Sequence, residues 1–162
     1  MTTVAYKDGI IAADTQATYG STPVLGASKI RRIRIGAEEW VVGISGEAWV
    51  CERLLVAMKY AASLDDWFWD PCPVDKDDLP SCMAVRARDG AIYTTSGGKS
   101  WSRLNSELWA IGSGCDYALG AMHAGASASD AVRIASALDV YTGGIIDTEH
   151  VLAAGKPTAP AP

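Results

Sequence analysis

The feature that most constrains the fold is a series of short β-type segments joined by tight turns. Each pair combines two runs of apolar, β-branched or aromatic side chains with a short glycine-containing turn, which is typical of a β-hairpin. Three hairpins are predicted in this way: 3–6 with 10–13, 29–35 with 39–44, and 82–86 with 91–95. Further strands are expected at 108–111 and within 143–154, whereas 20–26, rich in glycine, serine, threonine and proline, is predicted to be a loop.

Helical periodicity is found in three segments between these strands. Apolar residues recur at helical spacing over 48–62, opposite a polar face. Two alanine-rich helices follow at 116–124 and 129–140, and Ser127 or Ser129 is the expected N-cap of the second. The order of strands, helix, strands, helices and strand favours an α+β layered fold over an alternating doubly wound sheet.

Length and composition indicate one globular domain. A chain of 162 residues can bury a core of its own. The hydrophobic share of 49% and the charged share of 20% are close to those of ordinary globular domains. We expect the domain to span 1–154, followed by a disordered or extended tail at 155–162 that is rich in proline and alanine.

Charge and cysteine usage argue against several classes of protein. The net charge is −5 and no basic stripe exists beyond 29–34, which argues against a nucleic-acid-binding protein. Charged residues interrupt the first segment and no apolar run is long enough for a bilayer, so neither a signal peptide nor a membrane span is predicted. The four cysteines form no C-x-x-C pair and no cluster with histidine, which disfavours a zinc site and favours free thiols in a cytoplasmic protein.

Two glycine-rich stretches resemble nucleotide-binding motifs, but turns account for them better. Residues 97–100 (GGKS) match the end of a P-loop, yet Tyr93 stands where that motif requires its first glycine. Residues 112–120 follow a strand and precede a helix, as a dinucleotide fingerprint does. Their third glycine comes too late, however, and no parallel βαβ repeat surrounds them. Nucleotide binding is therefore the weaker alternative.

The N-terminus offers a different chemistry. Thr2 follows Met1, and its small side chain permits removal of the initiator methionine. A terminal threonine carries a hydroxyl nucleophile together with an α-amine, whose ordinary pKa of about 8 lets it act as a base near neutral pH. One residue would then supply both groups, which fits a chain with two histidines in all.

Several segments of the chain resemble motifs of proteasome β subunits and of the bacterial HslV peptidase. They are 2–14 (TTVAYKDGIIAAD), 26–33 (GASKIRRI), 42–46 (VGISG), 110–114 (AIGSG) and 139–144 (DVYTGG). The mature chains of that family begin with threonine and reach an aspartate at this distance. Each segment alone is a weak signal, but their shared order along nearly the whole chain makes the set specific.

The resemblance implies a fold and a nucleophile. The fold would be a four-layer α/β/β/α sandwich of two antiparallel sheets flanked by helices, the fold of N-terminal-nucleophile (Ntn) hydrolases. The hydroxyl of Thr2 would attack a peptide carbonyl, with its own amine accepting the proton through a water. Lys29 would stabilise the developing charge on the Thr2 oxygen, and Asp14 would hold Lys29 in place. The backbone N–H of Gly46 would face the oxyanion.

The same resemblance implies residues around the amine and the substrate. Ser113, Asp139 and Thr142 would form hydrogen bonds around the Thr2 amine and set its orientation and protonation; Thr142 stands where the family has serine. Thr22, in the stretch 22–24, and Ile44 would line the pocket beside the scissile bond. Peptide hydrolysis of this type requires no cofactor, and a structural monovalent cation is left open.

An assembly is also implied. Members of the family form a homo-oligomer of stacked rings with inward-facing sites, which keeps an unselective nucleophile away from folded proteins. The segment around Lys29 is closest to the HslV version, and HslV works with an AAA+ ATPase that unfolds substrates. We therefore expect such an unfoldase as a partner and unfolded proteins or peptides as substrates, with no nucleic acid and no membrane.

Two departures from the family leave other functions open. Glu47 stands where the family usually has a small residue, and its carboxylate would crowd the site, select basic side chains or point away. The stretch 63–80, predicted to be a loop or broken helix, is shorter than in the family, and its aromatic residues at 67–69 need burial. The alternatives are a catalytically silent ring protein or scaffold of the same fold, favoured by retention of Met1, and an Ntn amidohydrolase acting on small amides.

Overall fold

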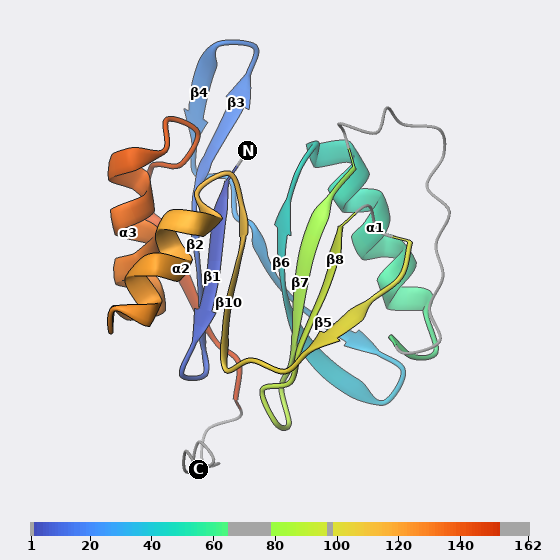
Figure 1. The fold of residues 1–162 in the computed structure, drawn as a ribbon. Helices are drawn as coiled ribbons and strands as arrows, with labels where there is room; N and C mark the ends of the chain where they lie inside the picture. Colours follow the sequence, from blue (N-terminus) through green and yellow to red (C-terminus); the bar gives the residue numbers. More distant parts are fainter. Residues whose placement is uncertain (1, 65–78, 97–98, 153–162) are drawn as a thin grey trace.

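The computed structural model of the chain describes residues 2–64, 79–96 and 99–152 (Figure 1). Most of the predicted loop at 63–80, including the aromatic residues at 67–69, lies outside the described residues. So do Met1, the paired glycines at 97–98 and the predicted tail at 155–162.

One antiparallel sheet brings the start of the chain to its inner strands, in the order β10-β1-β2-β11. Its strands are β1 (Thr3–Lys7), β2 (Ile10–Asp14), β10 (Leu108–Gly112) and β11 (Ile146–His150). Thr3 pairs with Gly112, and Asp14 pairs with Ile146. The start of β1 and the ends of β2 and β10 therefore meet at one end of this sheet.

A second antiparallel sheet has the strand order β5-β6-β7-β8-β9. Its strands are β5 (Ile30–Ile35), β6 (Glu38–Ser45), β7 (Ser81–Arg86), β8 (Ile92–Ser96) and β9 (Ser102–Leu104). The three hairpins predicted from the sequence, β1–β2, β5–β6 and β7–β8, are confirmed. The short strand β9 was not predicted.

A separate two-stranded hairpin corrects the predicted loop at 20–26. Strand β3 (Gln16–Tyr19) pairs with β4 (Thr22–Leu25), and Gly20, with a φ of 60°, occupies the turn between them. Every residue of β4 is exposed. No alternation of buried and exposed side chains therefore marks this strand in the sequence, which is why it was predicted to be a loop.

Helix α1 (Ala48–Tyr60) covers the five-stranded sheet, whereas α2 (Cys115–His123) and α3 (Ala128–Leu138) cover the four-stranded sheet (Figure 1). The three predicted helices are confirmed, with ends that differ by one or two residues. Ser127 is the N-cap of α3, because its hydroxyl accepts a hydrogen bond of 3.1 Å from the N–H of Asp130.

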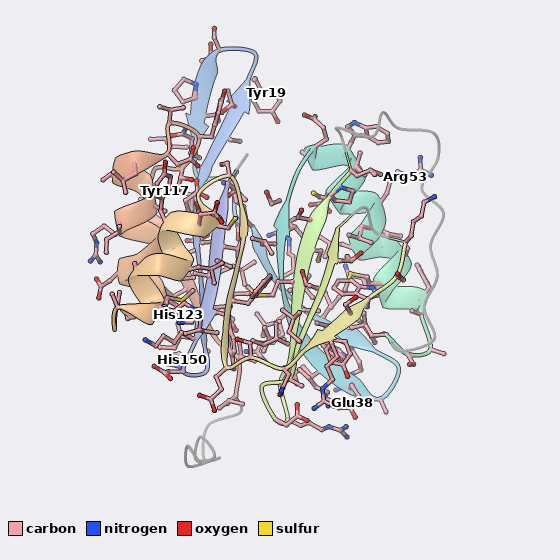
Figure 2. All side chains as sticks on the ribbon, in the orientation of Figure 1. Tyr19, Glu38, Arg53, Tyr117, His123 and His150 are labelled. Atoms are coloured by element: carbon pink, nitrogen blue, oxygen red, sulfur yellow. The ribbon has the colours of Figure 1, made fainter. Side chains whose placement is uncertain are left out.

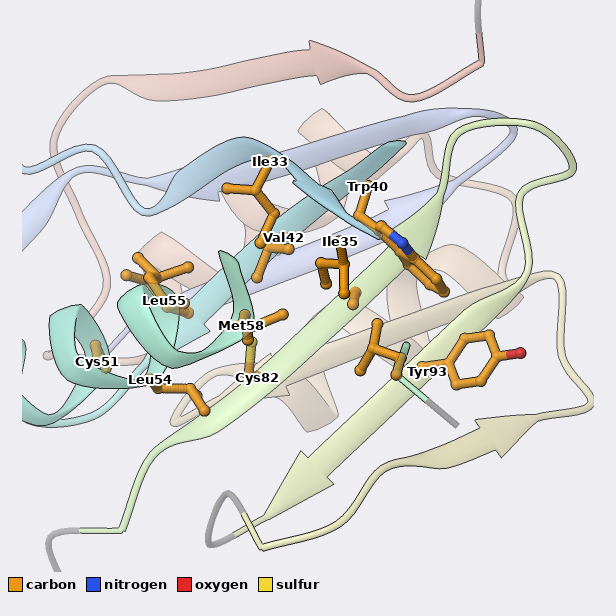
Figure 3. Packing of buried hydrophobic residues seen from close by; sticks show 13 residues of the cluster. Ile33, Ile35, Trp40, Val42, Cys51, Leu54, Leu55, Met58, Cys82 and Tyr93 are labelled. Carbon is orange, nitrogen blue, oxygen red and sulfur yellow. The ribbon is translucent and has the colours of Figure 1, made fainter. Parts of the chain in front are cut away.

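Three hydrophobic clusters hold these elements together. One contains Val4 and Ile11 of the first sheet with Val41 and Met83 of the second, and it therefore lies between the sheets. Another joins α1 to the five-stranded sheet (Figure 3), and the third joins α2 and α3 to the four-stranded sheet. The predicted α+β class with antiparallel sheets is confirmed.

The packing of α1 allows a direct test of this core. Leu54 is fully buried against the five-stranded sheet, whereas 51% of Val56, two residues further along the helix, is exposed. We expect Leu54→Ala to lower the free energy of unfolding by about 2–5 kcal/mol, because it removes buried methyl groups and leaves a cavity. Val56→Ala on the same helix should change it by less than about 0.5 kcal/mol. Urea denaturation followed by circular dichroism measures both, and equal losses would contradict this packing.

Candidate active site

Thr2 lies at the end of the four-stranded sheet where several elements converge. It precedes β1 and is buried, with 2% of its surface exposed. Asp14 is the last residue of β2, and Lys29 directly precedes β5. Asp14 is completely buried and Lys29 is 8% exposed. An ion pair that is hidden to this degree in a small domain is unusual and points to a specific role.

The carboxylate of Asp14 is the centre of a hydrogen-bond network. Its Oδ1 accepts from the hydroxyl of Thr2, from the N–H of Thr3 at 2.9 Å and from Nζ of Lys29 at 2.8 Å. Its Oδ2 accepts from the N–H groups of Gln16 and Gly143, both at 3.1 Å. A carboxylate offers about four lone-pair sites, and these five donors occupy them. Asp14 is therefore an anchor for the groups around it.

Lys29 is held as a charged group beside the Thr2 hydroxyl. Its Nζ donates to Asp14 and, at 2.6 Å, to the carbonyl oxygen of Gln16. Burial lowers the pKa of Lys29, and the hydrogen bond and charge of Asp14 oppose that shift. Since the lysine and the Thr2 hydroxyl contact the same oxygen of Asp14, the positive charge lies next to the oxygen that would become negative in a nucleophilic attack.

A second carboxylate, that of Asp139, is connected to Thr2 through Ser113. The hydroxyls of Ser113 and Thr142 both donate to its Oδ2 at 2.6 Å, and the N–H of Tyr141 donates to its Oδ1 at 3.2 Å. Partial burial raises the pKa of Asp139, but these hydrogen bonds outweigh it, so the pKa is below its ordinary value. Ser113 Oγ is also 3.4 Å from the carbonyl oxygen of Thr2, which connects this group to the candidate nucleophile.

The glycines of the Gly-Ser-Gly turn are explained by the residues that they face. Gly112 has a φ of 96°, and a side chain there would overlap the carbonyl group of Thr2. A side chain at Gly114 would overlap the hydroxyl of Thr3. The turn therefore lets β10 approach the first residues of the chain closely. This accounts for both glycines without a bound phosphate.

A pocket of about 330 Å³ opens beside Thr2. It is lined by β3, by the segment before β5, by the end of β6 and by the first turns of α1, and its lining includes Lys29, Ile44, Gly46 and Glu47. Gly46 has a φ of 134°, a conformation that favours glycine. Glu47 is exposed at the N-cap of α1 and is among the lining residues, and its side chain forms no capping hydrogen bond with the helix.

No histidine is among the described residues that line this pocket. Among the described residues, no group of three or more histidine, cysteine and acidic side chains could hold a metal ion. His123 and His150 are exposed (Figure 2), and His150 pairs with Ile10, at the other end of β2 from Asp14. None of the described helices is long and apolar enough to span a membrane.

The chain is similar to known proteins in its three-dimensional structure. No protein-family model matches the chain, and no curated protein matches it. The crystal structure of eukaryotic HslV from Trypanosoma brucei matches with a TM-score of 0.66 and 22% identity, over 93% of this chain and 98% of that one. The chain has the fold of HslV. A Gly-1 mutant of Anbu from Hyphomicrobium sp. strain MC1 also matches, with a TM-score of 0.66 and 12% identity, over 91% of this chain and 80% of that one.

The HslV fold confirms the resemblance seen in the sequence motifs at the level of fold. The structure brings the predicted catalytic side chains into two adjoining groups near Thr2: Asp14 and Lys29 in one, and Ser113, Asp139 and Thr142 in the other. Ile44, Gly46 and Glu47 are among the residues that line the pocket, and their roles in catalysis and substrate binding stay predictions. Thr22 is exposed at the start of β4 and is not part of the pocket lining, so its role stays a prediction.

Three residues of this candidate site were missed by sequence reasoning: Thr3, Gln16 and Gly143. Gln16 and Gly143 contribute through backbone groups to Asp14 and Lys29, and a backbone contact leaves no signal in residue type. Thr3 does carry a signal, because a second hydroxyl-bearing residue directly follows the candidate nucleophile in the sequence. Its place in a run of apolar, β-branched and aromatic residues led to its assignment as an ordinary strand residue.

Proposed function

We propose that this chain is a threonine-type endopeptidase of the HslV and proteasome β class, with Thr2 as nucleophile after removal of Met1. The observation that carries the proposal is the Asp14 oxygen shared by the Thr2 hydroxyl and Lys29. An ammonium group held this close favours the ionised form of the hydroxyl oxygen. The HslV fold supports the same assignment.

The reaction follows from these groups. Thr2 Oγ bonds to the carbonyl carbon of the scissile peptide, while its proton passes through a water to the Thr2 α-amine. The carbonyl oxygen becomes an oxyanion, for which the N–H of Gly46 is the proposed donor. The C–N bond then breaks, the leaving nitrogen takes the proton, and an ester remains on Thr2. Water hydrolyses the ester, releases the carboxylate product and restores the hydroxyl.

The remaining groups orient the nucleophile. Lys29 stabilises the negative charge on the Thr2 oxygen, and Asp14 fixes Lys29. The ionised Asp139, held by Ser113 and Thr142, provides the negative charge and the hydroxyls that orient the α-amine. The pocket beside Thr2 takes the side chain that precedes the scissile bond, with Ile44 in its wall and Glu47 at its edge.

The proposed setting is that of the HslV class. The domain would be a four-layer Ntn-hydrolase sandwich acting in the cytoplasm within stacked homo-oligomeric rings. An AAA+ unfoldase would feed it unfolded proteins, and hydrolysis itself would require no cofactor. Exposed apolar residues on α3 and on the following segment, such as Leu138, Val140 and Ile145, are consistent with burial against another copy.

Intact-mass spectrometry before and after treatment with a peptide epoxyketone, which reacts with N-terminal threonine, tests the function. We expect the mass of the chain without Met1, followed by one inhibitor adduct per chain. A chain that keeps Met1 and takes no adduct would favour the silent scaffold. A monomer or dimer in sedimentation velocity that hydrolyses small amides but no peptides would favour the amidohydrolase.

A further inference from the structure

Thr3 connects the two groups of side chains that surround the candidate nucleophile. It is fully buried at the start of β1. Its backbone N–H donates to Oδ1 of Asp14 at 2.9 Å, and its hydroxyl lies 2.7 Å from the hydroxyl of Thr142. Thr3 is thus bonded to the Asp14 group through its main chain and to the Asp139 group through its side chain.

The chemistry of these groups fixes the direction of the Thr3–Thr142 hydrogen bond. Asp139, whose pKa is below its ordinary value, is a carboxylate and can only accept hydrogen bonds. Thr142 Oγ1 lies 2.6 Å from Asp139 Oδ2, so its single hydrogen points to the carboxylate. Thr142 must then accept the hydrogen of Thr3. The result is a chain of donors that runs from Thr3 through Thr142 to Asp139.

The space around the Thr3–Thr142–Asp139 hydrogen bonds is just large enough for the two hydroxyls. A side chain at Gly114 would overlap the Thr3 hydroxyl and would come within 3.2 Å of Thr142 Oγ1. Thr142 is itself 3% exposed. The two hydroxyls therefore meet in a buried space that the lack of a side chain at Gly114 keeps open. A buried hydroxyl that loses its partner here has little access to replacement water.

We propose that Thr3 is a positioning residue that fixes Thr2 through the Thr3–Thr142–Asp139 chain, an inference that rests on the proposed function. Thr3 is covalently attached to Thr2, and its two anchors restrict the position of the nucleophile relative to both carboxylates. Misplacing a reacting group by about 1 Å can reduce a rate by about 10²-fold. Thr3 thereby sets the rate of attack without touching the substrate.

Replacement of the hydroxyl by a methyl group tests this role. We expect Thr3→Val to lower kcat for peptide cleavage at least tenfold with little change in KM, because the binding pocket is unaffected. Thr3→Ser, which keeps the donor, should recover most of kcat. Thr3→Ala removes the hydroxyl without placing a methyl group against Thr142, and it replaces Thr3→Val if that variant does not fold.

A matched control is available in the second sheet. Thr95 on β8 is 3% exposed, and its hydroxyl has no hydrogen-bond partner among the described residues. Thr95→Val should therefore leave kcat unchanged. A loss of kcat in Thr95→Val equal to that in Thr3→Val would overturn the inference, since it would reflect a general effect of buried valine.

A double-mutant cycle with Thr142→Val decides whether the two hydroxyls act together. If they form one chain, the double variant should be no slower than Thr142→Val alone. Effects on kcat that multiply, or a kcat of Thr3→Val equal to that of the wild type, would overturn this inference and leave the proposed function intact. Absence of an epoxyketone adduct on the wild type would instead overturn the proposed function, and the positioning role of Thr3 with it.

Discussion

Thr2→Ala should abolish peptide cleavage, with a loss in kcat/KM of at least about 10⁴-fold. The variant keeps the α-amine and every other residue of the site but lacks the oxygen that forms the acyl-enzyme ester. It should also form no epoxyketone adduct. Cleavage of a fluorogenic peptide and intact-mass spectrometry measure the two effects on the same sample.

Thr2→Ser is the matched variant for this experiment. Serine keeps the hydroxyl that donates to Asp14 and loses a methyl group, so we expect it to form the adduct and to retain measurable cleavage. Equal far-ultraviolet circular dichroism for both variants would show that neither has lost the fold. Peptide cleavage by Thr2→Ala at the wild-type rate would rule out Thr2 as the nucleophile.

The parts of the fold that could be predicted are those with a local signal in the sequence. The β1–β2 hairpin combines two apolar runs with an Asp8-Gly9 turn, and both turn residues have positive φ. Helix α1 has the apolar spacing of a helix packed on one face. In both elements the local preference and the tertiary packing agree, so a single segment was sufficient to predict the structure.

The parts that could not be predicted depend on long-range contacts. Strand β4 is exposed throughout and forms by pairing with β3, so its residues carry no periodic pattern. The contacts of Gln16 and Gly143 with Asp14 join residues far apart in the chain or use backbone atoms. The motif resemblance supplied the side chains of the site, whereas the groups that hold them became visible only in the folded structure.

The two carboxylates of the site differ in a way that suggests separate tasks. Asp14 is completely buried, and its donors include the ammonium of Lys29. Asp139 is partly exposed, and its side-chain donors are hydroxyls, which are neutral. The charge of Asp14 is therefore compensated within the site, while that of Asp139 is available to a nearby amine. This division matches a site in which one residue carries both the hydroxyl and the base.

Lys29→Met and Asp14→Asn should separate catalysis from stability. Lys29→Met removes the charge beside the Thr2 oxygen, and we expect it to lower kcat by about 10³-fold or more. Asp14 still keeps four donors in that variant, so the free energy of unfolding should fall by about 1–3 kcal/mol. Asp14→Asn leaves a buried ammonium without its counter-charge and deprives several donors of an acceptor. We expect it to cost about 3–5 kcal/mol.

Lys7→Met is the control for removing a lysine that is hydrogen-bonded but distant from Thr2. Lys7 Nζ donates to the carbonyl oxygens of Met122 and Ala126 at 2.9 and 3.0 Å, at the far end of β1 from Thr2. Its replacement should leave kcat unchanged and reduce stability modestly. Urea denaturation and peptide cleavage on the wild type and the three variants give the comparison.

The pH dependence of the wild type provides a second readout of Lys29. Raising the pH should lower the activity but increase the contribution of Lys29 to the free energy of unfolding. Burial places the pKa of Lys29 below its ordinary value of 10.5, so activity that depends on the charged form should fall as the pH rises through that lowered pKa. Between the folded and the unfolded pKa, the unfolded chain binds the proton more tightly, so the contribution of Lys29 to the free energy of unfolding increases with pH. Alkaline inactivation should therefore precede unfolding.

Cleavage by Lys29→Met at the wild-type rate, or a larger loss of stability in Lys29→Met than in Asp14→Asn, would contradict the role assigned to the Asp14–Lys29 pair.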